Sequence, residues 1–121
     1  MYASRMADGN PQLTPAAFQT LLALAKGRAH GYAIMGFVDE VSGGTAQLGP
    51  GTLYRTLARL VADGLVEEAP DASEDQPHDS RRRYYRLTRA GREVAAREAE
   101  FLSRLVAVAD QTGLLKRAES A

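Results

Sequence analysis

The sequence predicts a mainly helical α+β protein, in which a small β-hairpin is followed by one long helix. Two observations support this fold class. Residues 14–64 hold three segments with helical spacing of apolar residues, separated by Gly and Pro breakers. Residues 65–68 and 82–87 are typical of two short strands, and the second of these segments alternates between two faces. A helix-periodic stretch over 88–112 then follows. A length of 121 residues fits one domain, or one domain with an accessory helix.

The first expected helix follows a loose N-terminal arm over residues 1–12. Thr14 is a good N-cap, Pro15 suits the first helical position, and Gly27 is the expected terminator. The apolar residues of this helix, among them Phe18 and Leu22, cover more than one stripe. The helix should therefore pack against two partners.

Two further helices are expected from about Tyr32 to Ser42 and from Pro50 to Gly64, with a short extended piece around 47–48 between them. On the third helix one stripe is apolar and is expected in the core: Leu53, Leu57, Leu60 and Val61. A second stripe is polar: Thr52, Arg55, Thr56 and Arg59. His30 is expected to cap or turn the chain before the second helix, and Gly31 and Gly64 are attributed to backbone geometry.

The last helix is expected to begin after the N-cap Thr88 and to end before Gly113, leaving a loose tail over 113–121. Its apolar residues follow near-heptad rows that include Val94, Phe101, Leu102, Leu105 and Val106. Such rows would be exposed on a helix that extends past a small domain. We therefore predict that 88–112 form a dimerisation helix appended to a domain over 13–87.

Composition excludes several classes of function. The chain has no Cys and only two His residues, which lack partners at metal-ligand spacing, so neither a metal nor a cofactor is expected. Gly49-Pro50-Gly51 lacks the third glycine of a dinucleotide-binding turn. The longest apolar run, 21–25, is too short for a membrane span or a signal-peptide core. We expect a cytoplasmic protein that is not an enzyme.

The formal net charge is zero, but the charges are unevenly distributed. Six arginines lie between 81 and 92, directly after an acidic segment, 67–79, that holds Pro70 and Pro77. A solvated surface is the simple interpretation of such runs. However, a third helix with a polar stripe, followed by a hairpin that carries Arg, is the arrangement of a winged helix-turn-helix domain, whose third helix enters the DNA major groove. Thr52, Arg55, Thr56 and Arg59 fit that role, and Arg82 and Arg83 fit phosphate contacts.

The motifs that carry a family resemblance are Leu13-Thr14-Pro15, His30-Gly31-Tyr32, the segment from Gly49 to Tyr54, Asp63-Gly64-Leu65, and the segment from Arg83 to Thr88. In this order and spacing the chain resembles a PadR-family transcriptional regulator over roughly 13–109. The resemblance implies a cytoplasmic homodimer that binds DNA, usually a repressor released by a small effector. It also implies dimerisation through the last and first helices, here including Phe18, Leu22 and Val94.

Carried onto this chain, the resemblance places the start of the recognition helix on Pro50, Gly51, Thr52 and Tyr54. Tyr54 can be a core-edge aromatic, a phosphate contact or both, and we favour both. The chain departs from the family pattern in having Gly49 where Ser is common, and a longer acidic loop over 70–79 in place of a Gly-Arg-Pro tip.

The sequence thus predicts a homodimeric regulator that binds a pseudo-palindromic double-stranded DNA operator and responds to an effector whose identity the sequence does not give. A protein-interaction module without DNA binding is the alternative, because the same fold serves both functions. A small ligand-binding or catalytic protein that uses a dimer cleft is a third, more remote reading.

Overall fold

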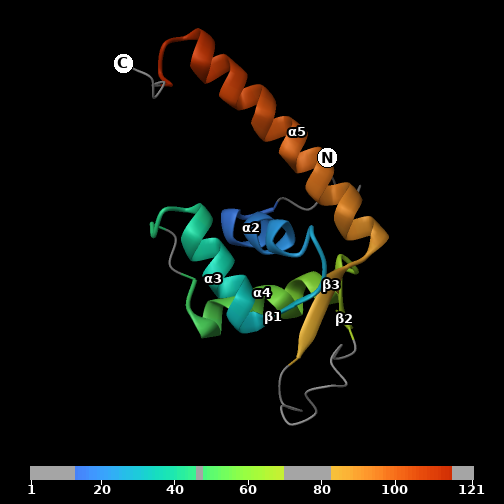
Figure 1. Ribbon diagram of the computed structural model, residues 1–121. Coiled ribbons are helices and arrows are strands. Elements are labelled where there is room, and N and C mark those ends of the chain that lie inside the picture. Colours follow the sequence, from blue (N-terminus) through green and yellow to red (C-terminus); the bar gives the residue numbers. More distant parts are fainter. Residues whose placement is uncertain (1–12, 46–47, 70–82, 116–121) are drawn as a thin grey trace.

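The computed structural model describes residues 13–45, 48–69 and 83–115 (Figure 1). Expectations for the N-terminal arm, Gln47, Arg82, the acidic loop over 70–79 and the last residues of the tail lie outside these ranges. The elements are, in order, α2 (Pro15–Ala23), β1 (Ala29–His30), α3 (Gly31–Val41), α4 (Pro50–Ala62), β2 (Val66–Ala69), β3 (Tyr84–Leu87) and α5 (Arg89–Gln111). The predicted mainly helical α+β class is confirmed.

The core lies between α2, α3, α4 and the sheet. Leucines on α4 face inward at helical spacing, and Leu53, Leu57 and Leu60 are buried together with Leu21, Leu24, Ile34, Val38, Leu65, Val66 and Tyr85. The expectation that Val61 completes this stripe is wrong, since its side chain is 41% exposed. At 100° per residue Val61 lies at the edge of the leucine row and not within it.

The sheet has three antiparallel strands in the order β1-β3-β2, one strand more than the predicted hairpin. β1 has two residues, Ala29 and His30, which pair with Tyr85 and Tyr84 of β3. A two-residue strand is too short to show alternation in the sequence. β3 is therefore a central strand that touches both the wing partner β2 and the turn that follows α2.

Helix α2 ends four residues before the expected terminator Gly27. Thr14 caps its start as predicted, its Oγ1 accepting from the Ala17 N–H at 3.0 Å. After Leu24, which is buried, short i→i+3 bonds carry the chain through a turn, including one from the Gly27 N–H to the Leu24 carbonyl at 3.2 Å. The chain turns here because it must reach β3 to form β1.

Helices α3 and α4 begin and end close to the predicted residues. His30 is confirmed as a cap, since its Nδ1 accepts from the Ala33 N–H at 3.2 Å. Gly64 ends α4 with a positive φ of 77°, and the Leu65 N–H donates back to the Leu60 carbonyl at 2.9 Å. The prediction that Gly64 serves backbone geometry is confirmed.

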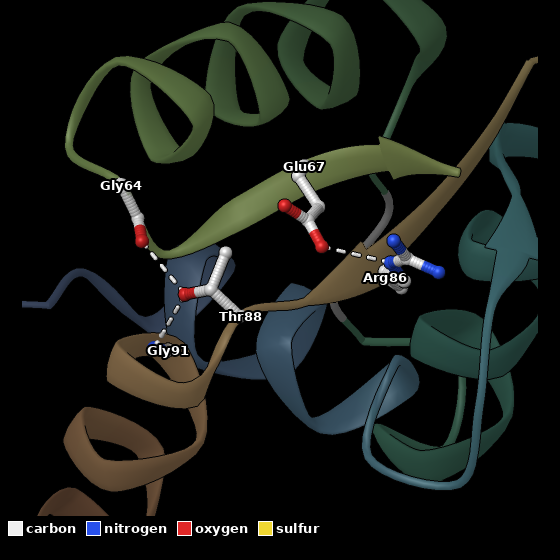
Figure 2. Close-up of polar contacts among 5 residues, drawn as sticks. All are labelled: Gly64, Glu67, Arg86, Thr88 and Gly91. Atoms are coloured by element: carbon white, nitrogen blue, oxygen red, sulfur yellow. Dashed lines mark hydrogen bonds and ion pairs between the residues drawn. The ribbon is translucent and has the colours of Figure 1, made fainter.

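The start of α5 is fixed to the turn after α4 (Figure 2). Thr88 Oγ1 donates to the Gly64 carbonyl at 2.7 Å and accepts from the Gly91 N–H at 2.9 Å. The Thr88 N–H donates to the Leu65 carbonyl at 3.1 Å. A Cβ on Gly91 would overlap that same carbonyl oxygen. We call these four residues, Gly64, Leu65, Thr88 and Gly91, the α4–α5 joint. From it α5 projects away from the three-helix core (Figure 1).

Candidate nucleic-acid interface

The outward face of α4 carries the predicted polar stripe. Thr52, Arg55 and Arg59 are exposed and Thr56 is half-buried. Arg59 Nε lies 3.9 Å from Asp63 Oδ2, and an Arg55 guanidinium nitrogen lies 3.5 Å from Thr52 Oγ1. Both contacts are long and solvent-exposed, so they hold the guanidinium groups weakly. The stripe is available for contact with another molecule.

A hollow of about 350 Å³ runs between the start of α2 and this face of α4. Its lining includes Arg55, Thr56, Arg59 and Asp63 from α4 and its cap, together with Leu13, Thr14 and Ala17 from the α2 side. The structure thus brings three of the four stripe residues to one edge of α4, beside the α2 N-terminus. The sequence did not indicate this contribution of α2.

The N-terminus of α4 has no side-chain cap. Gly49 supplies none, and Pro50 and Gly51 at the start of the helix are exposed. The free N–H groups of the first turn and the positive end of the helix dipole are features that suit a phosphate oxygen. The nearest side-chain atom to a Cβ placed on Gly51 would be an Arg55 guanidinium nitrogen, at 3.6 Å.

Tyr54 lies between α4 and the start of α3. It is 47% exposed, and its ring end packs so closely on Gly31 that a Cβ there would overlap the phenol oxygen. Gly31 does not have a positive φ, so the attribution of this glycine to backbone conformation is wrong. The missing side chain leaves room for Tyr54. This position agrees with the predicted role of Tyr54 as a core-edge aromatic residue. Its predicted contact with a phosphate stays a prediction.

The wing strands pair their charges across the sheet. Arg83 donates to Glu68 Oε2 at 3.2 Å. Arg86 Nε donates to Glu67 Oε2 at 2.8 Å, as Figure 2 shows. No acidic residue lies between positions 81 and 92 of the sequence, yet the fold brings Glu68 next to Arg83. Arg83 would have to exchange Glu68 for a phosphate in order to contact DNA. Burial, and next the charge of Glu68, raise the pKa of Tyr85 on the same strand.

Helix α5 leaves much of its apolar surface uncovered. Phe101, Leu105 and Val106 are 45%, 49% and 53% exposed, and Leu102 is half-buried. Val94 is half-buried and packs against the core of its own domain, and its assignment to the dimer surface stays a prediction. Val94 lies close to the α4–α5 joint, where α5 contacts the domain, whereas Phe101 and the apolar residues after it lie beyond the domain. On α2, which contacts α5, Leu22 is exposed and Phe18 is half-buried.

Two further findings concern other kinds of site. Among residues 13–45, 48–69 and 83–115, no three His, Asp or Glu side chains gather as they would around a metal ion. No helix in the described part of the chain has the length and apolar character needed to cross a membrane.

The helix pair α3–α4, the strands β2 and β3 and the third strand β1 together form a winged helix-turn-helix domain with an appended helix. Residues 20–97 match the transcriptional regulator PadR-like family. The chain therefore belongs to this family, which confirms the resemblance inferred from the motifs. The family that it belongs to is one of transcriptional regulators.

Among curated proteins, the chain is similar to an uncharacterized 37.1 kDa protein in transposon TN4556 of Streptomyces fradiae, with 45% identity over 85 residues, 70% of this chain and 22% of the relative. It is also similar to the transcriptional regulator Rv3488 of Mycobacterium tuberculosis, with 43% identity over 68 residues, 55% of this chain and 59% of the relative. The chain thus spans less than two thirds of either relative.

Solved structures share the fold. A PadR family transcription regulator from Clostridium difficile R20291 superimposes with a TM-score of 0.66 at 24% identity, covering 82% of this chain and 98% of the other. The complex structure of hsRosR-S1 gives a TM-score of 0.62 at 32% identity and covers 83% and 82% of the two chains.

Proposed function

We propose that the protein is a homodimeric repressor that binds a pseudo-palindromic double-stranded DNA operator and is released by a small effector. The observation that carries the proposal is the outward face of α4, where Arg55 and Arg59 are exposed on a helix whose N-terminus has no side-chain cap. A helix of this kind, presented by a winged domain, fits the DNA major groove. Chromosomal DNA as the partner implies the cytoplasm as the place of action.

The proposed contacts divide into two kinds. Arg55, Thr56 and Thr52 are assigned to base edges, because they project from the first half of α4. Phosphates are assigned to the first turn of α4, which holds Pro50, Gly51 and Tyr54, and to Arg59 in its last turn. On the wing, phosphates are assigned to Arg83 and, outside the described residues, to Arg82.

Dimerisation follows from the same mechanism. Two half-sites of an operator lie about 34 to 36 Å apart, and one small domain makes few base contacts. The uncovered row of Phe101, Leu102, Leu105 and Val106, with Phe18 and Leu22 on α2, supports a seam between two copies. Since the joint fixes α5 to the end of α4, the seam would also fix the distance between the two recognition helices.

The test is the salt dependence of binding to a random-sequence duplex, measured by fluorescence anisotropy between about 50 and 200 mM salt. We expect affinity to fall steeply, with a slope near 0.9 for each phosphate contacted. Arg59→Ala should reduce the slope, whereas Arg97→Ala on α5 is the matched control and should not. Affinity that hardly changes with salt would favour the alternative, a winged-helix module that binds protein.

A further inference from the structure

A second hollow lies where the turn after α2, the strand β3 and the start of α5 meet. Its volume is about 350 Å³, and its lining shares no residue with the hollow beside α4. Three of its six lining residues are arginines from three different elements: Arg28 in the turn after α2, Arg86 on β3 and Arg92 on α5. Leu24, Gly27 and Leu87 complete it.

Two of these guanidinium groups are held in place by contacts that leave donors free. Arg86 uses its Nε for Glu67, at 2.8 Å, and a terminal nitrogen of Arg92 donates to the Ala25 carbonyl at 3.2 Å. Each guanidinium has five N–H donors, so both retain unused ones. Arg28 is exposed, and no carboxylate in the described part of the chain pairs with it.

The charge around the hollow is therefore unbalanced. Glu67 neutralises one of the three cations and leaves about two positive charges around one concavity. A phosphate monoester carries about −1.5 to −2 at neutral pH and offers three acceptor oxygens. Guanidinium groups match phosphate oxygens with paired N–H donors. The volume is at the lower end of small-molecule sites, which span about 300 to 1,000 Å³, and exceeds what a bare ion needs.

We propose that this hollow binds the phosphate group of a small phosphorylated molecule through Arg28, Arg86 and Arg92. The ligand would touch the α2 turn, the end of β3 and α5 at once. Leu87 directly precedes Thr88 of the α4–α5 joint, so a bound molecule would alter how α5 is held against the domain. The assignment of this hollow as the effector site rests on the proposed operator binding. Under that proposal, a bound ligand would change the spacing of the two recognition helices and so release the operator.

The site can be tested without DNA. Inorganic phosphate is titrated into the full chain by isothermal calorimetry, with chloride at equal ionic strength as the reference. We expect saturable binding of phosphate only. Arg28→Gln should weaken it about tenfold or more, since a charge-assisted hydrogen bond is lost, and Arg86→Gln should do the same. Arg97→Gln, an exposed arginine on α5 outside the hollow, is the matched control and should bind like the parent.

Circular dichroism on each variant shows whether the fold is retained, and Arg28→Gln is the cleaner variant because Arg28 makes no hydrogen bond or ion pair with the described residues, whereas Arg86 is bonded to Glu67. The proposal is overturned if phosphate shows no saturable binding, or if Arg28→Gln binds it as well as Arg97→Gln does. It is also overturned if Arg28→Gln lowers the salt slope for random duplex by about one, because the anion would then be a backbone phosphate of DNA. Since the titration contains no DNA, its result does not depend on operator binding.

Discussion

Replacement of Gly91 by Ala should destabilise the protein, although alanine is the better helix former. Gly91 lies in the first turn of α5, and a Cβ there would overlap the carbonyl oxygen of Leu65. The obstacle is backbone, so no side-chain rotation relieves it. Either α5 or the turn after α4 must move, which weakens the hydrogen bonds from Thr88 to Gly64 and Leu65.

The expected magnitude follows from opposing terms. Overpacking against a fixed neighbour costs about 1 to 3 kcal/mol, and each weakened hydrogen bond costs about 1 kcal/mol. The gain in helix propensity from Gly to Ala is at most about 1 kcal/mol. We therefore expect a net loss of roughly 2 to 4 kcal/mol in the free energy of unfolding, measured by urea titration with far-UV circular dichroism at fixed protein concentration.

Gly36 supplies a matched control. It lies inside α3, it is exposed, and a Cβ built on it meets nothing within 4 Å. Gly36→Ala should therefore stabilise the protein by about 0.5 to 1 kcal/mol. If Gly91→Ala were as stable as the parent, or were to gain stability as Gly36→Ala does, the steric role assigned to the joint would be refuted.

Three further predictions follow from the site and the core. Arg55→Ala should lower the ratio of operator to random-duplex affinity by about 1 to 3 kcal/mol, measured by anisotropy, and an equal loss for both duplexes would make Arg55 a phosphate contact instead. Leu102→Glu combined with Leu105→Glu should give folded monomers by light scattering and circular dichroism, because unpaired charge at a seam costs several kcal/mol; an unfolded chain, or a dimer that still binds operator, would contradict the seam. Because the pKa of Tyr85 is raised in the folded state, its contribution to stability is full below pH 10 and is lost as pH rises through the folded pKa; Tyr85→Phe should flatten this loss in urea titrations, and an unchanged alkaline profile would contradict the assignment.

Local signals in the sequence were sufficient for most of the helix boundaries. Thr14 and Thr88 cap the helices that they were expected to cap, and Gly64 and Gly113 have the positive φ of helix terminators. In each case the deciding interaction spans at most a few residues. The polar face of α4 was predictable for the same reason, since helical spacing alone places its residues.

Features that depend on distant pairing were not predictable. β1 exists only because Ala29 and His30 meet β3, and the partner of Arg83 is Glu68, 15 residues earlier in the chain. The need for glycine at 91 comes from the backbone of Leu65. The hollow at Arg28 was not predictable either, because it is formed by three elements that no local sequence pattern connects.

The junction between β1 and α3 contains no spacer. His30 is the last residue of β1 and also the cap of α3, which begins at the next residue. One inserted or deleted residue here would turn α3 by about 100° relative to its cap, or would move the side chains of β1 to the opposite face of the sheet. Variation in chain length is thus excluded at this point, and any protein engineered on this scaffold has to keep 29–31 at constant length.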